Sequence, residues 1–172
     1  MSSGAGLGLE ASAEARAARY REVVAVVRSL LEGEDDWIAG LATVVAELHG
    51  AFSYFDWTGC YRLVKPDLLV IGPYQGGHGC LRIEVSRGVC GAAVRARATQ
   101  LVPDVALFAD HIACSTLTRS EIVVPIVTPA GRILGVLDVD SNALAAFGEV
   151  DREHLEEVCR ILGEQFATTD RL

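Results

Sequence analysis

The stretch WTGCYRLVKPDLLVIGPY, residues 57–74, predicts a β-hairpin. It holds two runs rich in β-branched and aromatic residues, and Lys65-Pro66-Asp67 separates them. β-Branched and aromatic residues favour strands, whereas Pro and Asp favour turns. Strands joined by so short a turn pair antiparallel. We therefore expect an antiparallel sheet to begin here.

Further strands follow this hairpin along the chain. CLRIEV (80–85) comes after a glycine-rich break, and residues 100–102 form a short run. SEIVVPIVT (120–128) and RILGVLDVDS (132–141) predict a second hairpin around Pro129-Ala130-Gly131. Residues 103–120 form a long irregular stretch, and a loop of that length in a compact domain usually has a function.

Helical periodicity appears at both ends of the chain, over residues 11–31, 37–50 and 150–167, and a short Ala- and Val-rich helix is expected over 88–98. A chain of 172 residues suits one domain. We predict an α/β (α+β) fold with one domain over residues 9–172 after a flexible start, 1–8. Its mainly antiparallel sheet of about six strands has the N- and C-terminal helices on one face. The short helix and the long loop lie on the other face, with the pocket.

Composition excludes several classes of partner. The net charge is −8 and no basic cluster is present, so we expect no nucleic-acid partner. No apolar run approaches the ~18 residues of a membrane-spanning helix, and the N-terminus lacks the pattern of a secretory signal. We therefore expect a cytoplasmic protein without a membrane partner. Disulfides in that compartment are usually transient and catalytic.

Five cysteines exclude a framework in which every cysteine is paired. Cys60 and Cys159 fit the apolar patterns of a strand and a helix, so we predict both in the core. Cys80, Cys90 and Cys114 could be buried core residues, or could pass a disulfide among themselves. With His111 they could also ligate zinc, although their spacings are not those of a zinc finger.

Acidic residues interrupt two strands that are otherwise apolar. Asp138 and Asp140 are two positions apart and therefore share one face, and Glu121 begins the neighbouring strand. If both aspartates are buried together, the pKa of one of them should rise. An ionised carboxylate could bind a substrate ammonium, and a protonated one could donate to a leaving oxygen. Alternatively, the two aspartates only cap a turn.

Six stretches together resemble the free methionine-R-sulfoxide reductases, an enzymatic branch of the GAF-domain family. They are DWTGCYRL (56–63), LVIGPYQG (69–76), CLRIEVSRGVCGAAV (80–94), VPDV…HIAC (102–114), SEIVVPIV (120–127) and GVLDVDS (135–141).

The resemblance implies reduction of free L-methionine-(R)-S-oxide to L-methionine. Cys114 attacks the substrate sulfur and becomes a sulfenic acid, Cys80 resolves it as a disulfide, and Cys90 is an auxiliary or alternative partner. Thioredoxin or a related dithiol protein supplies electrons, and neither a metal nor an organic cofactor is needed. Glu121, Asp138 and Asp140 line the pocket. Trp57 could hold the S-methyl group, although core packing explains it equally well, and backbone N–H groups of Ile112 and Ala113 could bind the substrate carboxylate.

A GAF module that senses a small ligand, or a thiol redox sensor, is the alternative, since this fold supports many functions. Three carboxylates in the pocket would repel a phosphate-bearing ligand, whereas a redox sensor would not require them. The resemblance also allows a homodimer through the terminal helices, for which Val24, Val27 and Leu31 are suitable.

Overall fold

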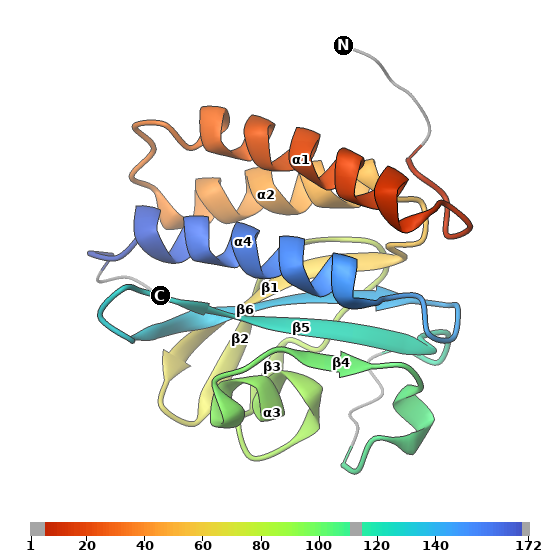
Figure 1. Ribbon diagram of the computed structural model, residues 1–172. Helices are drawn as coiled ribbons and strands as arrows, with labels where there is room; N and C mark the ends of the chain where they lie inside the picture. Colours follow the sequence, from red (N-terminus) through yellow and green to blue (C-terminus); the bar gives the residue numbers. More distant parts are fainter. Residues whose placement is uncertain (1–5, 111–114, 170–172) are drawn as a thin grey trace.

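The computed structural model describes residues 6–110 and 115–169. A six-stranded sheet has the order β3-β2-β1-β6-β5-β4, and every neighbouring pair is antiparallel (Figure 1). This confirms the predicted fold class. The strands are β1 (Trp57–Lys65), β2 (Leu68–Gln75), β3 (Arg82–Glu84), β4 (Gln100–Val102), β5 (Ser120–Val127) and β6 (Ile133–Ser141).

Three long helices cover one face of the sheet, and one short helix lies on the other (Figure 1). Helix α2 packs on β1 and β2, α4 packs on β5, and α1 packs on α2 and α4. Helix α2 begins where predicted because the Asp36 side chain accepts hydrogen bonds from the first free backbone N–H groups, those of Ile38 and Ala39. The helices are α1 (Ala13–Leu30), α2 (Trp37–Ala51), α3 (Gly88–Ala96) and α4 (Glu149–Gln165).

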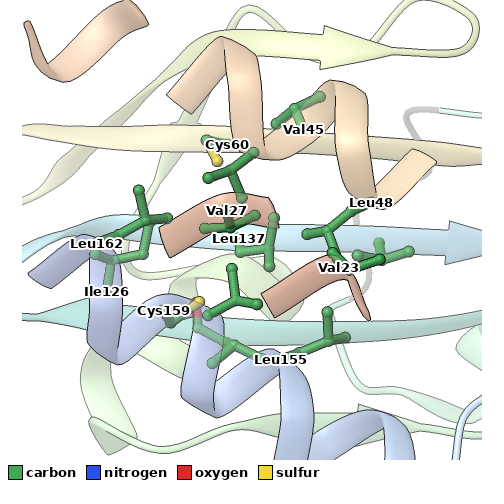
Figure 2. Close-up of a cluster of buried hydrophobic side chains, with 14 of the residues drawn as sticks. Val23, Val27, Val45, Leu48, Cys60, Ile126, Leu137, Leu155, Cys159 and Leu162 are labelled. Carbon is green, nitrogen blue, oxygen red and sulfur yellow. The ribbon is translucent and has the colours of Figure 1, made fainter. Parts of the chain in front are cut away.

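Alternation along the strands divides the interior into two cores. Cys60 of β1 points toward the long helices, whereas Trp57 and Tyr61 of the same strand belong to the core on the opposite face. Figure 2 shows the first core, in which Cys60 and Cys159 lie among valine, leucine and isoleucine side chains. Both thiols are buried, as predicted, and neither is in a disulfide. The second core lies between the sheet and α3, whose residues Val89, Cys90, Ala93 and Val94 pack against the strands.

Two expectations about the chain ends need correction. Leu7, inside the stretch predicted to be flexible, pairs with the end of α2: its N–H donates to Ala51 and its carbonyl accepts from Ser53. The apolar residues suggested for a dimer interface, Val24, Val27 and Leu31, are buried within the single chain against the other long helices. They therefore offer no exposed face to a second copy.

No helix in the described part of the chain is both long enough and apolar enough to cross a membrane.

Candidate active site

A cavity of about 440 Å³ lies on the α3 face of the sheet. Its size is in the range of small-molecule sites, and it combines an apolar wall with a few polar groups, as such sites do. Strands β1, β5 and β6 form its floor, α3 forms one wall, and segments 77–79 and 115–118 form its rim. The lining includes Asp56, Trp57, Tyr61, His78, Ile83, Val89, Cys90, Thr118, Glu121, Asp138, Asp140 and Asn142.

Strand register brings the three predicted carboxylates to this floor. Glu121 of β5 is the direct partner of Asp140 in β6, and Asp138 lies two residues before it on the same face. On the other side of β6, Trp57 of β1 is also a direct partner of Asp140. The sheet therefore positions the acidic residues and the aromatic ring in one pocket. A role for the aspartates in capping the turn alone is excluded by their position.

Cys90 enters the same cluster from α3. Its Sγ atom lies 3.4 Å from Oδ2 of Asp138 and donates a hydrogen bond to it. The Cys90 Sγ atom, one carboxylate oxygen of Glu121 and one of Asp138 all lie within 4.8 Å of one another. The second oxygen of Asp138, Oδ1, is buried, and no residue in the described part of the chain donates to it when all the carboxyls are ionised. A protonated Glu121 carboxyl can donate to Asp138, so Glu121 and a ligand compete for this carboxylate.

The carboxyls of this cluster have raised pKa values. Burial is the main cause for all three residues, and neighbouring carboxyls add to it: Asp140 for Glu121, Glu121 for Asp138, and Asp138 for Asp140. Like charges at this separation in a buried site oppose one another's ionisation, so the cluster keeps its protons to a higher pH than exposed carboxyls do. Burial, followed by Asp138 and Glu121, also raises the pKa of the Cys90 thiol. This thiol is therefore neutral rather than a reactive thiolate.

Trp57 and Tyr61 form the apolar wall. Their rings are stacked with centroids 5.9 Å apart, and Trp57 also stacks on Tyr74 at 5.6 Å. Tyr61 lies in the core on this face and also lines the pocket, although it was not among the predicted site residues. The signal was present in the sequence, because residues 57, 59 and 61 alternate onto one face of a strand. Asp56 is a second lining residue that the sequence reasoning missed.

The cysteines differ in state. Cys80 is disulfide-bonded, whereas Cys60, Cys90 and Cys159 are free. Because the Cys80 sulfur is in a disulfide, it is not available as a ligand for the alternative zinc set of Cys80, Cys90, His111 and Cys114. Cys114 lies outside the described residues, as do His111, Ile112 and Ala113. The structure therefore does not test the roles predicted for Cys114, Ile112 and Ala113.

Comparison with known proteins identifies the family. The family model described as GAF domain matches residues 39–164, which is most of the chain. The chain therefore belongs to the GAF-domain family.

Within that family, the chain is similar to proteins named free methionine-R-sulfoxide reductase. The Escherichia coli protein of that name is 40% identical over 151 residues, which cover 88% of this chain and 90% of that one. The crystal structure of the Neisseria meningitidis enzyme in complex with its substrate superposes with a TM-score of 0.84. It is 46% identical and covers 95% of this chain and 96% of that one. The reduced form of the Staphylococcus aureus enzyme has a TM-score of 0.80 and 40% identity, covering 85% of this chain and 94% of that one.

Proposed function

We propose that the protein reduces free L-methionine-(R)-S-oxide to L-methionine by thiol–disulfide chemistry. The observation that carries this proposal is one pocket with three parts: a buried carboxylate cluster, an aromatic wall, and a segment that leads directly into a disulfide-bonded cysteine. The Escherichia coli, Neisseria and Staphylococcus relatives are named for this activity, and the similarity to this chain extends over most of their length. Their similarity supports the same substrate here.

The carboxylates provide the means of selecting a free amino acid. An ionised carboxylate of the Glu121, Asp138 and Asp140 cluster would bind the substrate ammonium, and the Asp138 oxygen that does not accept from Cys90 would accept from it. Within a peptide the same nitrogen is an uncharged amide and cannot make this charge-assisted contact. The S-methyl group would rest against Trp57 and Tyr61, since sulfur groups pack favourably on aromatic rings. We expect the N–H groups of Ile112 and Ala113 to bind the substrate carboxylate.

The redox steps balance with two thiols. The Cys114 thiolate attacks the sulfoxide sulfur, and the oxygen with a proton passes to the cysteine, which gives methionine and a Cys114 sulfenic acid. The Cys80 thiol then attacks that sulfenic sulfur, so that an S–S bond forms, the S–O bond breaks and water leaves. Cys80 suits the resolving role better than Cys90, because Cys80 is in a disulfide here and Cys90 is a free, neutral thiol.

The carboxyl cluster also supplies a proton. With several raised pKa values in one buried group, one carboxyl can be ionised while another remains protonated. The protonated group would donate to the sulfoxide oxygen and make the sulfur more electrophilic. The external reductant would be thioredoxin or a related dithiol protein, which returns both thiols to the reduced state. A cytoplasmic location, where such reductants occur, remains a prediction.

A reductant-coupled assay tests the proposal. Thioredoxin, thioredoxin reductase and NADPH would be combined with the R and S epimers of free methionine sulfoxide separately. We expect NADPH oxidation with the R epimer only, and its loss in Cys114→Ser and Cys80→Ser. If neither epimer is turned over, even with dithiothreitol as reductant, the proposal is wrong and a ligand or redox sensor becomes the better account. If turnover survives Cys114→Ser, the attacking thiol is a different cysteine.

A further inference from the structure

Segment 76–80 carries Cys80, the cysteine that is in a disulfide, along the rim of the pocket. Its main chain has little support of its own. Within the described part of the chain, Gly77, His78 and Gly79 make no main-chain to main-chain hydrogen bond. Besides the disulfide at Cys80, a side-chain contact holds the segment: Nε1 of Trp57 donates to the Gly77 carbonyl at 3.1 Å.

Glycines surround the Trp57 ring on several sides. A Cβ added to Gly59, beside Trp57 on β1, would overlap the far edge of the indole. A Cβ on Gly79 would lie 2.9 Å from Cζ2 of Trp57 and 3.1 Å from the Tyr61 hydroxyl. Gly76 has a positive φ of 108°, and a Cβ there would lie 3.0 Å from Cδ1 of the ring and 2.7 Å from the Asp56 carbonyl. The segment can therefore approach the ring this closely only with glycine at these positions.

The ring itself is firmly held. Trp57 is 7% exposed, stacks between Tyr61 and Tyr74, and begins strand β1 opposite Asp140. It therefore connects the carboxylate floor of the pocket to the segment that carries Cys80. Among the described residues, the Trp57 ring is therefore what the main chain of residues 77–79 rests on, while the disulfide holds the segment at Cys80.

We propose that Trp57 is a positioning residue for the resolving step: it seats segment 76–80 so that the Cys80 thiol meets the sulfenic acid. This proposal rests on the proposed function. Cys80 must attack the sulfenic sulfur within the pocket before a further oxidant converts it to a sulfinic acid. Formation of the S–S bond and departure of water require the two sulfurs to meet in line, and a displacement of about 1 Å can slow such a step by up to about a hundredfold. The sulfoxide reduction that precedes it does not involve Cys80.

Substitution of Gly79 by alanine tests this. Gly79→Ala places a methyl group against Trp57 and displaces the segment from the ring. Gly77→Ala is the matched control, because a Cβ there has no atom within 4 Å and the carbonyl that accepts from Trp57 is retained. Trp57→Phe keeps an aromatic ring and removes the hydrogen bond. Circular dichroism and melting curves would establish that each variant is folded.

Pre-reduced protein would be mixed with the R epimer without external reductant and quenched at intervals. Methionine, disulfide and sulfenic acid trapped with a cyclic 1,3-diketone would be measured by mass spectrometry. In Gly79→Ala we expect methionine to form within about threefold of the original rate, while disulfide formation slows about tenfold or more and the trapped sulfenic acid accumulates. Trp57→Phe also changes the wall proposed to contact the substrate S-methyl group, so for this variant the rate of disulfide formation is compared with its own rate of methionine formation, and we expect that ratio to fall. Gly77→Ala should resolve at a rate within about twofold of the unmodified protein.

Two results would overturn the proposal. Disulfide formation in Gly79→Ala at the unmodified rate would show that the seat on Trp57 does not set the position of Cys80. A parallel slowing of methionine and disulfide formation would show that the ring acts on substrate binding instead. Absence of methionine from the unmodified protein would instead contradict the proposed function itself, so the two failures are distinguishable.

Discussion

The thiol of Cys90 donates its hydrogen bond to the carboxylate of Asp138, across 3.4 Å from Sγ to Oδ2. Burial and the nearby carboxyls raise the pKa of this thiol, so it remains protonated at neutral pH. Helix α3 thereby supplies a hydrogen-bond donor to the carboxylate cluster, and the cysteine needs no redox role to be useful there.

Replacement of Cys90 by serine should separate these two roles. Serine keeps a donor at nearly the same place, so Cys90→Ser should retain kcat/KM within about threefold. Cys90→Ala removes the donor and should lower kcat/KM about fivefold, which corresponds to a hydrogen bond worth ~1 kcal/mol. Steady-state assays with the R epimer measure both. If serine and alanine both abolish turnover as Cys80→Ser is expected to do, Cys90 is a redox thiol.

The carboxylate cluster should make stability depend on pH. The pKa of Asp138 is raised by burial and then by Glu121, from an ordinary value of 3.8. A carboxyl with a raised pKa stabilises the fold below its ordinary pKa, and this contribution is lost as the pH rises through the raised value. Asparagine does not ionise, so the Asp138→Asn variant should not lose this stability as the pH rises. Its Tm should exceed that of the unmodified protein by about 3 °C at pH 8, with a smaller difference at pH 5.

Differential scanning fluorimetry without substrate, at pH 5, 6, 7 and 8, checks this expectation. A Tm difference that is the same at every pH would show that Asp138 titrates normally in the folded protein. Asp138→Asn should nevertheless lose activity, since the neutral amide cannot attract the substrate ammonium.

The substrate should need a free ammonium group. N-acetylation of L-methionine-(R)-S-oxide removes the charge and leaves the sulfoxide unchanged. We expect kcat/KM to fall at least about a hundredfold. The acetylated substrate displaces water from the buried carboxylate without giving it a cationic partner, so the cost of desolvating that carboxylate is not offset. Competition experiments with both compounds in one reaction would measure the ratio directly. Similar rates for both would show that the carboxylates do not select the amine.

Asp151, at the start of α4, anchors that helix to α1 far from the pocket. Its fully buried carboxylate accepts from Tyr20 at 2.9 Å and from Tyr54 at 2.6 Å, and it pairs with Arg16 at 3.0 Å. Arg16→Met leaves this carboxylate without its cation and should lower the free energy of unfolding by about 3 kcal/mol.

Urea unfolding measures that loss, and Arg19→Met is the control on the same helix. Arg19 pairs with Glu22 on the exposed surface, so its replacement should cost less than ~0.5 kcal/mol. The folded Arg16→Met variant should keep its kcat/KM. Equal stability of the two variants would contradict a stabilising role for the buried pair.

The strands and helices could be predicted from the sequence because local signals and tertiary packing agree. Asp36 caps α2, Pro66 and Asp67 turn the first hairpin, and residue alternation assigned Asp138 and Asp140 to one face. Leu7 was mispredicted because small residues dominate its neighbourhood, and only the backbone of the α2 terminus holds it. Val24, Val27 and Leu31 were suggested for a dimer because periodicity shows that a helix face is apolar, not what covers it.

The site was harder to predict than the fold where its contacts join distant segments. Nothing in the local sequence places Cys90 beside Asp138, since α3 reaches β6 only in the folded chain. Tyr61 could have been assigned to the pocket from its strand parity with Trp57. The seat that Trp57 provides for segment 76–80 required the structure, because glycines in sequence do not reveal which side chain they contact.

The most direct test of the account is a count of methionine formed per chain. Fully reduced protein would be mixed with excess free L-methionine-(R)-S-oxide in the absence of any external reductant. The account predicts about one methionine per chain, the loss of two hydrogens from the protein mass, and a Cys80–Cys114 disulfide in the peptide map. No methionine, or an equal yield from the S epimer, would contradict it.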